Sequence, residues 1–104
     1  MKVAVVGSRS ISKADISRYI PPDTDLIISG GAIGVDKLAE EYADKKGIKK
    51  LILYPEYELY GKSAPLIRDK LIVDHADLVI AANPHQREWL LENGCRALIT
   101  IYGL

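Results

Sequence analysis

The chain has few of the residues that build disulfides and metal sites. Among its 104 residues are one cysteine, Cys95, and two histidines, His75 and His85. A single cysteine excludes an internal disulfide and a zinc site made of several cysteines. Neither histidine has metal-ligand partners at a suitable spacing, so we expect no metal site. No Ser-His-Asp or Cys-His arrangement indicates a nucleophile. Cys95 precedes an apolar stretch, where we expect a small buried thiol.

Long apolar runs and an excess of one charge are also missing. No apolar stretch approaches the roughly 20 residues of a membrane span, and the run Val3–Val6 is too short for a signal peptide. Lys and Arg together number 14, as do Asp and Glu. No overall positive field therefore attracts nucleic acid or an anionic membrane, although a local basic patch is compatible with this balance. We expect a cytoplasmic protein with no membrane partner.

The composition is typical of a folded domain. The 104 residues are 48% hydrophobic and 27% charged, and domains most often hold about 100–150 residues. We therefore predict a single domain over residues 1–104, and we expect no cofactor.

Strand and helix patterns alternate along the chain. Apolar, β-branched runs predict five strands, at 3–6, 25–29, 50–54, 77–82 and 96–102. Helical spacing predicts four helices, at 12–20, at 34–46, from 62 or 63 to about 74, and at 85–92. Ser12 and Asp15 are placed to begin the first helix, and Gly47 to end the second. Residues 56–62 are predicted to form a loop.

This alternation predicts an α/β fold, namely a three-layer, Rossmann-like parallel sheet of five strands with helices on both faces. The sequence leaves the strand order open, and we take it as 3-2-1-4-5. In that order the first and fourth strands flank the switch point, where ligands bind outside the carboxyl ends of the strands.

Loops of small residues follow the first two strands. Gly7-Ser8 follows the first, and Ser29-Gly30-Gly31-Ala32-Ile33-Gly34 follows the second and leads into a helix. A strand, a glycine loop and a helix together present N–H groups and a helix dipole to an anion. We predict that the two loops jointly hold a phosphate or carboxylate. The alternative is that the glycines only make tight turns.

Three sequence motifs, taken in their order along the chain, resemble those of a known superfamily. Val6-Gly7-Ser8-Arg9, Ile28-Ser29-Gly30-Gly31-Ala32-Ile33-Gly34-Val35-Asp36 and Ala76-Asp77-Leu78-Val79-Ile80 resemble the SLOG superfamily of Rossmann-like domains. Tyr60-Gly61-Lys62-Ser63-Ala64-Pro65-Leu66-Ile67-Arg68-Asp69 is similar to the middle pattern of its YspA-like branch. The resemblance covers nearly the whole chain up to Ala82. It implies binding of a nucleotide or an ADP-ribose-like phosphorylated ligand, by a sensor or an accessory module.

These motifs and loops define a candidate ligand site. Arg9 is placed to pair with a phosphate, unless it is a solvated loop residue. Asp36 is placed to bind a ribose hydroxyl or to brace the glycine loop, and the resemblance favours Arg68 reaching the site rather than forming a surface ion pair. Tyrosines at 54, 57 and 60 either stack on a base or pack the nearby loop. The candidate ligand-binding residues are Gly7, Ser8, Arg9, Ser29, Gly30, Gly31, Ala32, Gly34, Asp36, Tyr60, Gly61, Arg68, Asp69 and Asn83.

Two other functions stay open. Phosphoribohydrolases of the LOG group carry Pro-Gly-Gly-x-Gly-Thr-x-x-Glu after the fourth strand, where this chain has Ala82-Asn83-Pro84-His85-Gln86-Arg87-Glu88. That difference counts against cleavage of a nucleoside monophosphate, for which Asp36, Asp69 and Glu88 are the only nearby acid–base candidates. The motif Ser-Gly-Gly-Ala-x-Gly-x-Asp also resembles the DprA family of DNA-uptake proteins. Zero net charge counts against binding of single-stranded DNA.

The predicted fifth strand, 96–102, lies at the edge of a sheet in the order 3-2-1-4-5. An exposed edge must be covered or paired. We therefore expect a homodimer or a larger assembly.

Overall fold

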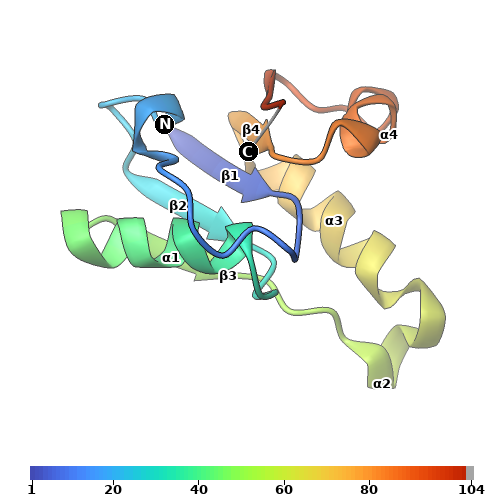
Figure 1. The fold of residues 1–104 in the computed structure, drawn as a ribbon. Helices are drawn as coiled ribbons and strands as arrows, with labels where there is room; N and C mark the ends of the chain where they lie inside the picture. Colours follow the sequence, from blue (N-terminus) through green and yellow to red (C-terminus); the bar gives the residue numbers. More distant parts are fainter. Residues whose placement is uncertain (103–104) are drawn as a thin grey trace.

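The computed structural model describes residues 1–102, which form a parallel sheet in the order β3-β2-β1-β4-β5 (Figure 1). All four neighbouring strand pairs are parallel. The strands are β1 (Lys2–Val6), β2 (Leu26–Ser29), β3 (Lys49–Ile52), β4 (Leu78–Ala81) and β5 (Leu98–Thr100). The predicted fold class and strand order are therefore confirmed.

The central strand β1 is buried on both faces because successive side chains of a strand point to opposite sides of the sheet. Val3 and Val5 belong to one apolar cluster, and Ala4 and Val6 belong to the other. The first cluster includes buried residues of α1 (Val35–Lys46). The second includes buried residues of α3 (Ala64–His75) and α4 (Arg87–Glu92). Helices therefore cover both faces of the sheet, as the three-layer prediction requires.

The predicted helix at 12–20 is wrong, since the segment contains only a 3-10 turn, η1 (Ser17–Tyr19). Asp15 accepts hydrogen bonds from the Ser17 amide, at 3.0 Å, and from the Ser17 hydroxyl. Such local side-chain bonds offer the backbone an alternative to a helix. Ile16 and Ile20 are nevertheless buried against the sheet, as their spacing predicts.

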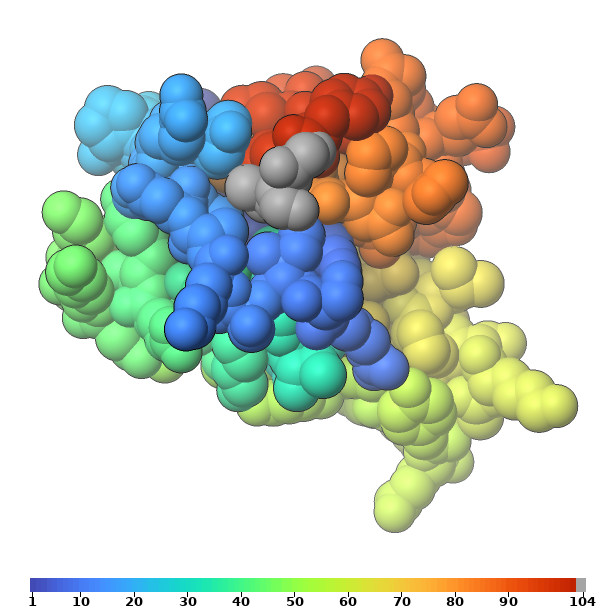
Figure 2. Space-filling view, in the orientation of Figure 1, coloured from blue at the N-terminus to red at the C-terminus, as the bar shows by residue number. Residues whose placement is uncertain are grey.

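The predicted loop at 56–62 is also wrong in part. It contains the single-turn helix α2 (Tyr57–Tyr60), and η2 (Gly61–Ser63) then leads into α3. Pro65 lies in the first turn of α3, where its missing N–H costs little. The chain around α2 protrudes from the body of the molecule, in yellow-green at the lower right of Figure 2.

The remaining boundaries shift by one to a few residues. Gly47 ends α1 as predicted, with φ +70° and its amide donating to the carbonyls of Ala43 and Asp44. The fourth helix is preceded by the 3-10 turn η3 (Pro84–Gln86), which Asn83 caps by accepting from the His85 amide at 3.0 Å. In the described part of the chain, no helix is both long and apolar enough to cross a membrane.

Candidate functional site

The two small-residue loops lie against each other at the carboxyl edge of the sheet. The Val35 amide donates to the Ser8 carbonyl at 3.0 Å. A Cβ at Gly34, which has φ +81°, would lie 2.3 Å from that same carbonyl oxygen. The close approach of the two backbones therefore requires glycine at this position. The predicted adjacency of the two loops is confirmed.

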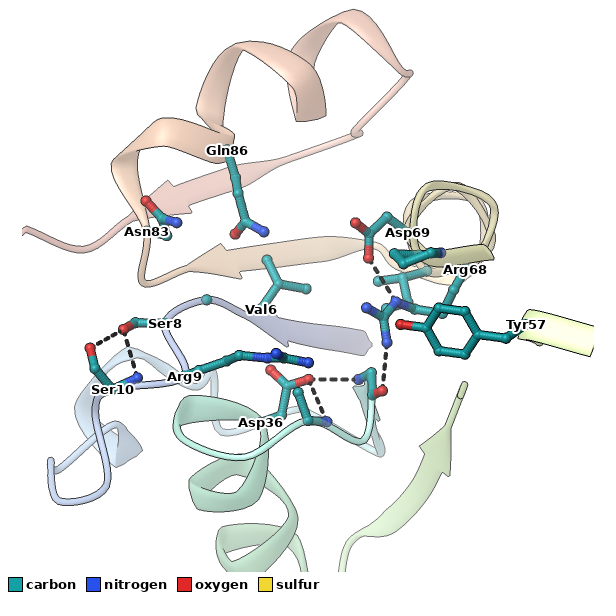
Figure 3. A pocket seen from close by; sticks show the side chains of 15 residues that line it. Val6, Ser8, Arg9, Ser10, Asp36, Tyr57, Arg68, Asp69, Asn83 and Gln86 are labelled. Atoms are coloured by element: carbon teal, nitrogen blue, oxygen red, sulfur yellow. Dashed lines mark hydrogen bonds and ion pairs between the residues drawn. The ribbon is translucent and has the colours of Figure 1, made fainter. Parts of the chain in front are cut away.

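A cleft of about 660 Å³ opens above the tips of β1, β2 and β4 (Figure 3). This is the switch point of the sheet, where α/β folds bind ligands, and the volume is in the range of ordinary ligand pockets. Its lining combines the loop after β1, the loop after β2, the start of α1, the α2–α3 region and the segment after β4. Nine predicted residues contribute to the lining: Gly7, Ser8, Arg9, Gly30, Ala32, Asp36, Arg68, Asp69 and Asn83.

Five predicted residues lie outside this lining: Ser29, Gly31, Gly34, Tyr60 and Gly61. Ser29 is fully buried beneath the loop. A Cβ at Gly31 would lie 2.4 Å from the ring of Tyr54, so this glycine faces the β3 side. Of the three neighbouring tyrosines, Tyr57, which begins α2, is the one that lines the cleft.

The Asp36 carboxylate braces the second loop from inside. Its Oδ2 accepts hydrogen bonds from the Gly30 amide at 3.1 Å and the Ala32 amide at 3.3 Å. A carboxylate in the first turn of α1 thus takes the position that a bound anion would occupy. Of the two roles predicted for Asp36, the structure shows the bracing one.

The third amide of this loop is also engaged. The Gly31 amide donates to Ser29 Oγ at 3.1 Å, and the Ser29 hydroxyl donates to Glu40 Oε2 at 2.7 Å. Three successive amides therefore point to oxygens of the protein itself. The expectation that the amides of both glycine loops jointly hold an anion is therefore wrong for Gly30, Gly31 and Ala32. The Ile33 and Gly34 amides donate to no backbone carbonyl among residues 1–102, so for them it stays a prediction.

The buried position of Asp36 is unfavourable for the charged form of its carboxyl group. The residue is only 6% exposed, and burial raises the pKa of its carboxyl group from 3.8 to about 6. The amides of Ala32 and Gly30 and the Arg68 guanidinium lower the pKa, but burial is the larger effect.

Arg68 reaches the site from α3, as the resemblance implies. Its Nη1 donates to the Gly30 carbonyl at 2.6 Å and its Nε to Asp69 Oδ1 at 2.8 Å. The two side chains are 15% and 26% exposed, so their ion pair lies inside the cleft rather than on a solvated face. Burial raises the pKa of Asp69. A Cβ at Gly30 would lie 2.5 Å from Arg68 Nη1, so the guanidinium would have to shift if this residue carried a side chain.

The first loop also has amides without backbone partners. Among residues 1–102, the Ser8 and Arg9 amides donate to no backbone carbonyl. The Ser8 and Ser10 hydroxyls lie 2.6 Å apart, and the Ser10 amide donates to Ser8 Oγ at 3.1 Å. Arg9 is exposed, extends into the cleft in Figure 3, and forms no ion pair within the described chain.

Six residues that line the cleft are absent from the predicted set, although Tyr57 is a candidate stacking residue: Val6, Ser10, Tyr57, Pro65, Ile72 and Gln86. Ser10 and Gln86 follow β1 and β4 closely in the sequence, so their proximity to the ends of these strands could have identified them as site residues. Tyr57 and Pro65 reach the cleft only through α2 and the start of α3. Cys95 lies outside the cleft and is half-buried rather than buried, and burial raises the pKa of its thiol.

No group of three or more His, Cys, Asp or Glu side chains that could hold a metal occurs within residues 1–102. No protein-family model matches the chain, and no curated protein or solved structure matches it significantly. The site is therefore interpreted from its own geometry.

Proposed function

We propose that the protein binds a nucleotide or a nucleotide-derived, ADP-ribose-like phosphorylated ligand in this cleft, as a sensor or accessory module of the SLOG type. The observation that carries the proposal is the position of an exposed arginine and two backbone amides at the β1 end of a ligand-sized cleft. Because the cleft lies at the switch point, strand tips and helix starts converge on the ligand.

The phosphate belongs at the first loop. The amides of Ser8 and Arg9 and the planar guanidinium of Arg9 supply several donors to phosphate oxygens. Arg68 adds positive charge, but two of its nitrogens already donate to Gly30 and Asp69. The Asp36 carboxylate keeps the second loop folded without an anion, so the cleft is preformed.

The test is calorimetric titration with ADP-ribose, AMP and ribose 5-phosphate, using Arg9→Ala. Loss of a charge-assisted contact weakens binding by about 10-fold or more. Lys13→Ala removes an exposed cation of the same segment that does not line the cleft, so it serves as the matched control. Absence of binding by all three compounds, or equal affinities for the two variants, would refute the proposal.

A second candidate, cleavage of a nucleoside monophosphate at the glycosidic bond, is favoured by one observation. Two carboxyl groups in the cleft, Asp36 and Asp69, have pKa values raised by burial, and a general acid works best when its pKa is near the operating pH. Incubation with AMP and chromatography for free adenine tests it. Adenine release that Asp69→Asn abolishes would establish hydrolysis, and no release leaves binding as the function.

We also propose that the protein is a homodimer. Large apolar side chains gather around α2 and α3, each 44–69% exposed: Tyr54, Tyr57, Leu59, Tyr60, Leu66 and Leu71. Contiguous exposed apolar surface is typical of interfaces. The predicted edge strand β5 is an edge, but Tyr54, Tyr60 and Leu71 of this set border the opposite edge strand, β3. Light scattering should find a dimer that Leu59→Glu converts to monomer; a wild-type monomer would contradict the proposal.

A further inference from the structure

A smaller pocket, of about 190 Å³, adjoins the cleft between α3 and the segment η3–α4. The two hollows share the side chains of Val6, Asp69, Ile72 and Gln86. Beyond this shared border the small pocket is walled mainly by apolar groups, including the ring of Trp89. A ligand whose phosphate lies at the β1 loop can therefore extend into it from the cleft.

Gln86 stands at the border with an unsatisfied polar atom. Its Oε1 is buried and has no hydrogen-bond partner among residues 1–102. Exchanging the oxygen and nitrogen of the amide would leave an unpaired atom in the same place. Buried polar atoms without partners are rare and lower stability. Figure 3 shows the Gln86 side chain directed toward the cleft, so rotation about its last side-chain bond brings the oxygen to a ligand.

We propose that this small pocket takes the base of the nucleotide, with the ring packed against Trp89 and an N–H of the base donating to Gln86 Oε1. The proposal rests on the proposed function and adds an orientation to it, with the phosphate at Ser8–Arg9 and the base between α3 and α4.

The chemistry of the pocket fits a base better than a sugar or a hydrocarbon. A cavity of about 150 Å³ in another protein holds benzene, so 190 Å³ is sufficient for an aromatic ring. The hydroxyl groups of a sugar would lose their hydrogen bonds to water at the apolar wall without gaining others. A hydrocarbon would leave the Gln86 oxygen unpaired. A flat heterocycle with N–H groups on its edge satisfies both the apolar wall and the amide.

Trp89 is the only tryptophan of the chain, so its fluorescence reports directly on the pocket. The probes are AMP, ribose 5-phosphate and purine riboside 5′-monophosphate, which is AMP without its amino group. AMP should change the Trp89 emission and bind at least 10-fold more tightly than ribose 5-phosphate, which should leave the emission unchanged. Purine riboside 5′-monophosphate should bind about 5-fold more weakly than AMP, the effect of one hydrogen bond.

Gln86→Leu is the decisive variant. Because it removes an unpaired polar atom, its melting temperature without ligand should not fall. Its affinity for AMP should fall about 5- to 10-fold while its affinity for ribose 5-phosphate stays unchanged. Glu92→Leu makes a similar change at an exposed position of α4 that borders neither hollow, and it should bind all three probes like the wild type.

The outcomes separate the two proposals. If AMP and ribose 5-phosphate bind equally, or if Gln86→Leu binds AMP like Glu92→Leu, the base does not occupy this pocket, while phosphate binding at the β1 loop stands. If neither AMP nor ribose 5-phosphate binds, the proposed orientation is refuted, and the proposed function is refuted with it when ADP-ribose also fails to bind.

Discussion

The stability of the folded protein depends on the ionisation of Asp36, and this dependence can be measured as a change of stability with pH. The carboxyl group has a pKa of about 6 in the folded protein, against an ordinary value of 3.8. Between these two values the folded state binds more protons than the unfolded state. The unfolding free energy must therefore fall as the pH rises through this range, and it levels off above about pH 7. A difference of about 2 pKa units corresponds to at most about 3 kcal/mol.

Replacing Asp36 by asparagine removes this pH dependence without removing the acceptor. The amide oxygen of Asp36→Asn still accepts from the Gly30 and Ala32 amides, but the side chain does not ionise. The difference in unfolding free energy, variant minus wild type, should increase by up to about 3 kcal/mol between pH 4 and pH 7. Urea denaturation followed by circular dichroism at each pH measures this difference, in which the contributions of other titrating groups cancel.

The control is Glu41→Gln, which removes an exposed carboxylate from the same helix. Its effect should stay within about 0.5 kcal/mol, as for most surface substitutions. If the unfolding free energies of Asp36→Asn and the wild type change in parallel from pH 4 to pH 7, the pKa of the Asp36 carboxyl group is not raised in the folded protein. The inference that burial outweighs the two amides and Arg68 would then be wrong.

Three further predictions concern stability and reactivity. Gly34→Ala should lower the unfolding free energy by more than about 2 kcal/mol, whereas Gly47→Ala, with a similar positive φ but open space around its Cβ position, should cost about 1 kcal/mol. Equal losses of unfolding free energy in urea denaturation would show that the backbone of the first loop does not approach Gly34 closely. Arg68→Lys should lower the unfolding free energy by about 1–3 kcal/mol, because one ammonium cannot replace the guanidinium bonds to Gly30 and the neighbouring carboxylate; an unchanged melting temperature argues against this. Cys95 should react with a disulfide reagent at pH 8 several-fold more slowly in the folded protein than in urea, since burial raises its pKa, and equal rates would contradict that cause.

Local sequence signals were sufficient for most of the fold. The β-branched run at Val3–Val6 predicts a strand buried on both faces, and β1 has this burial. The spacing of apolar residues after Gly34, and Gly47 at the end, predict α1 nearly to the residue. These signals succeed because strand burial and helix ends depend on residues close together in the chain. At 12–20 two local signals competed, and the bonds between Asp15 and Ser17 replaced the helix.

By itself, the sequence determined that the candidate residues after β1, β2 and β4 share one edge, because the carboxyl ends of parallel strands always do. Only the tertiary structure decided which polar groups at that edge are already engaged. The Asp36 carboxylate meets the second loop only when α1 packs on the sheet, and Arg68 and Gln86 meet the cleft only when α3 and α4 pack on the other face. Hydrogen bonds require positions accurate to a few tenths of an ångström, and packing between distant segments sets those positions.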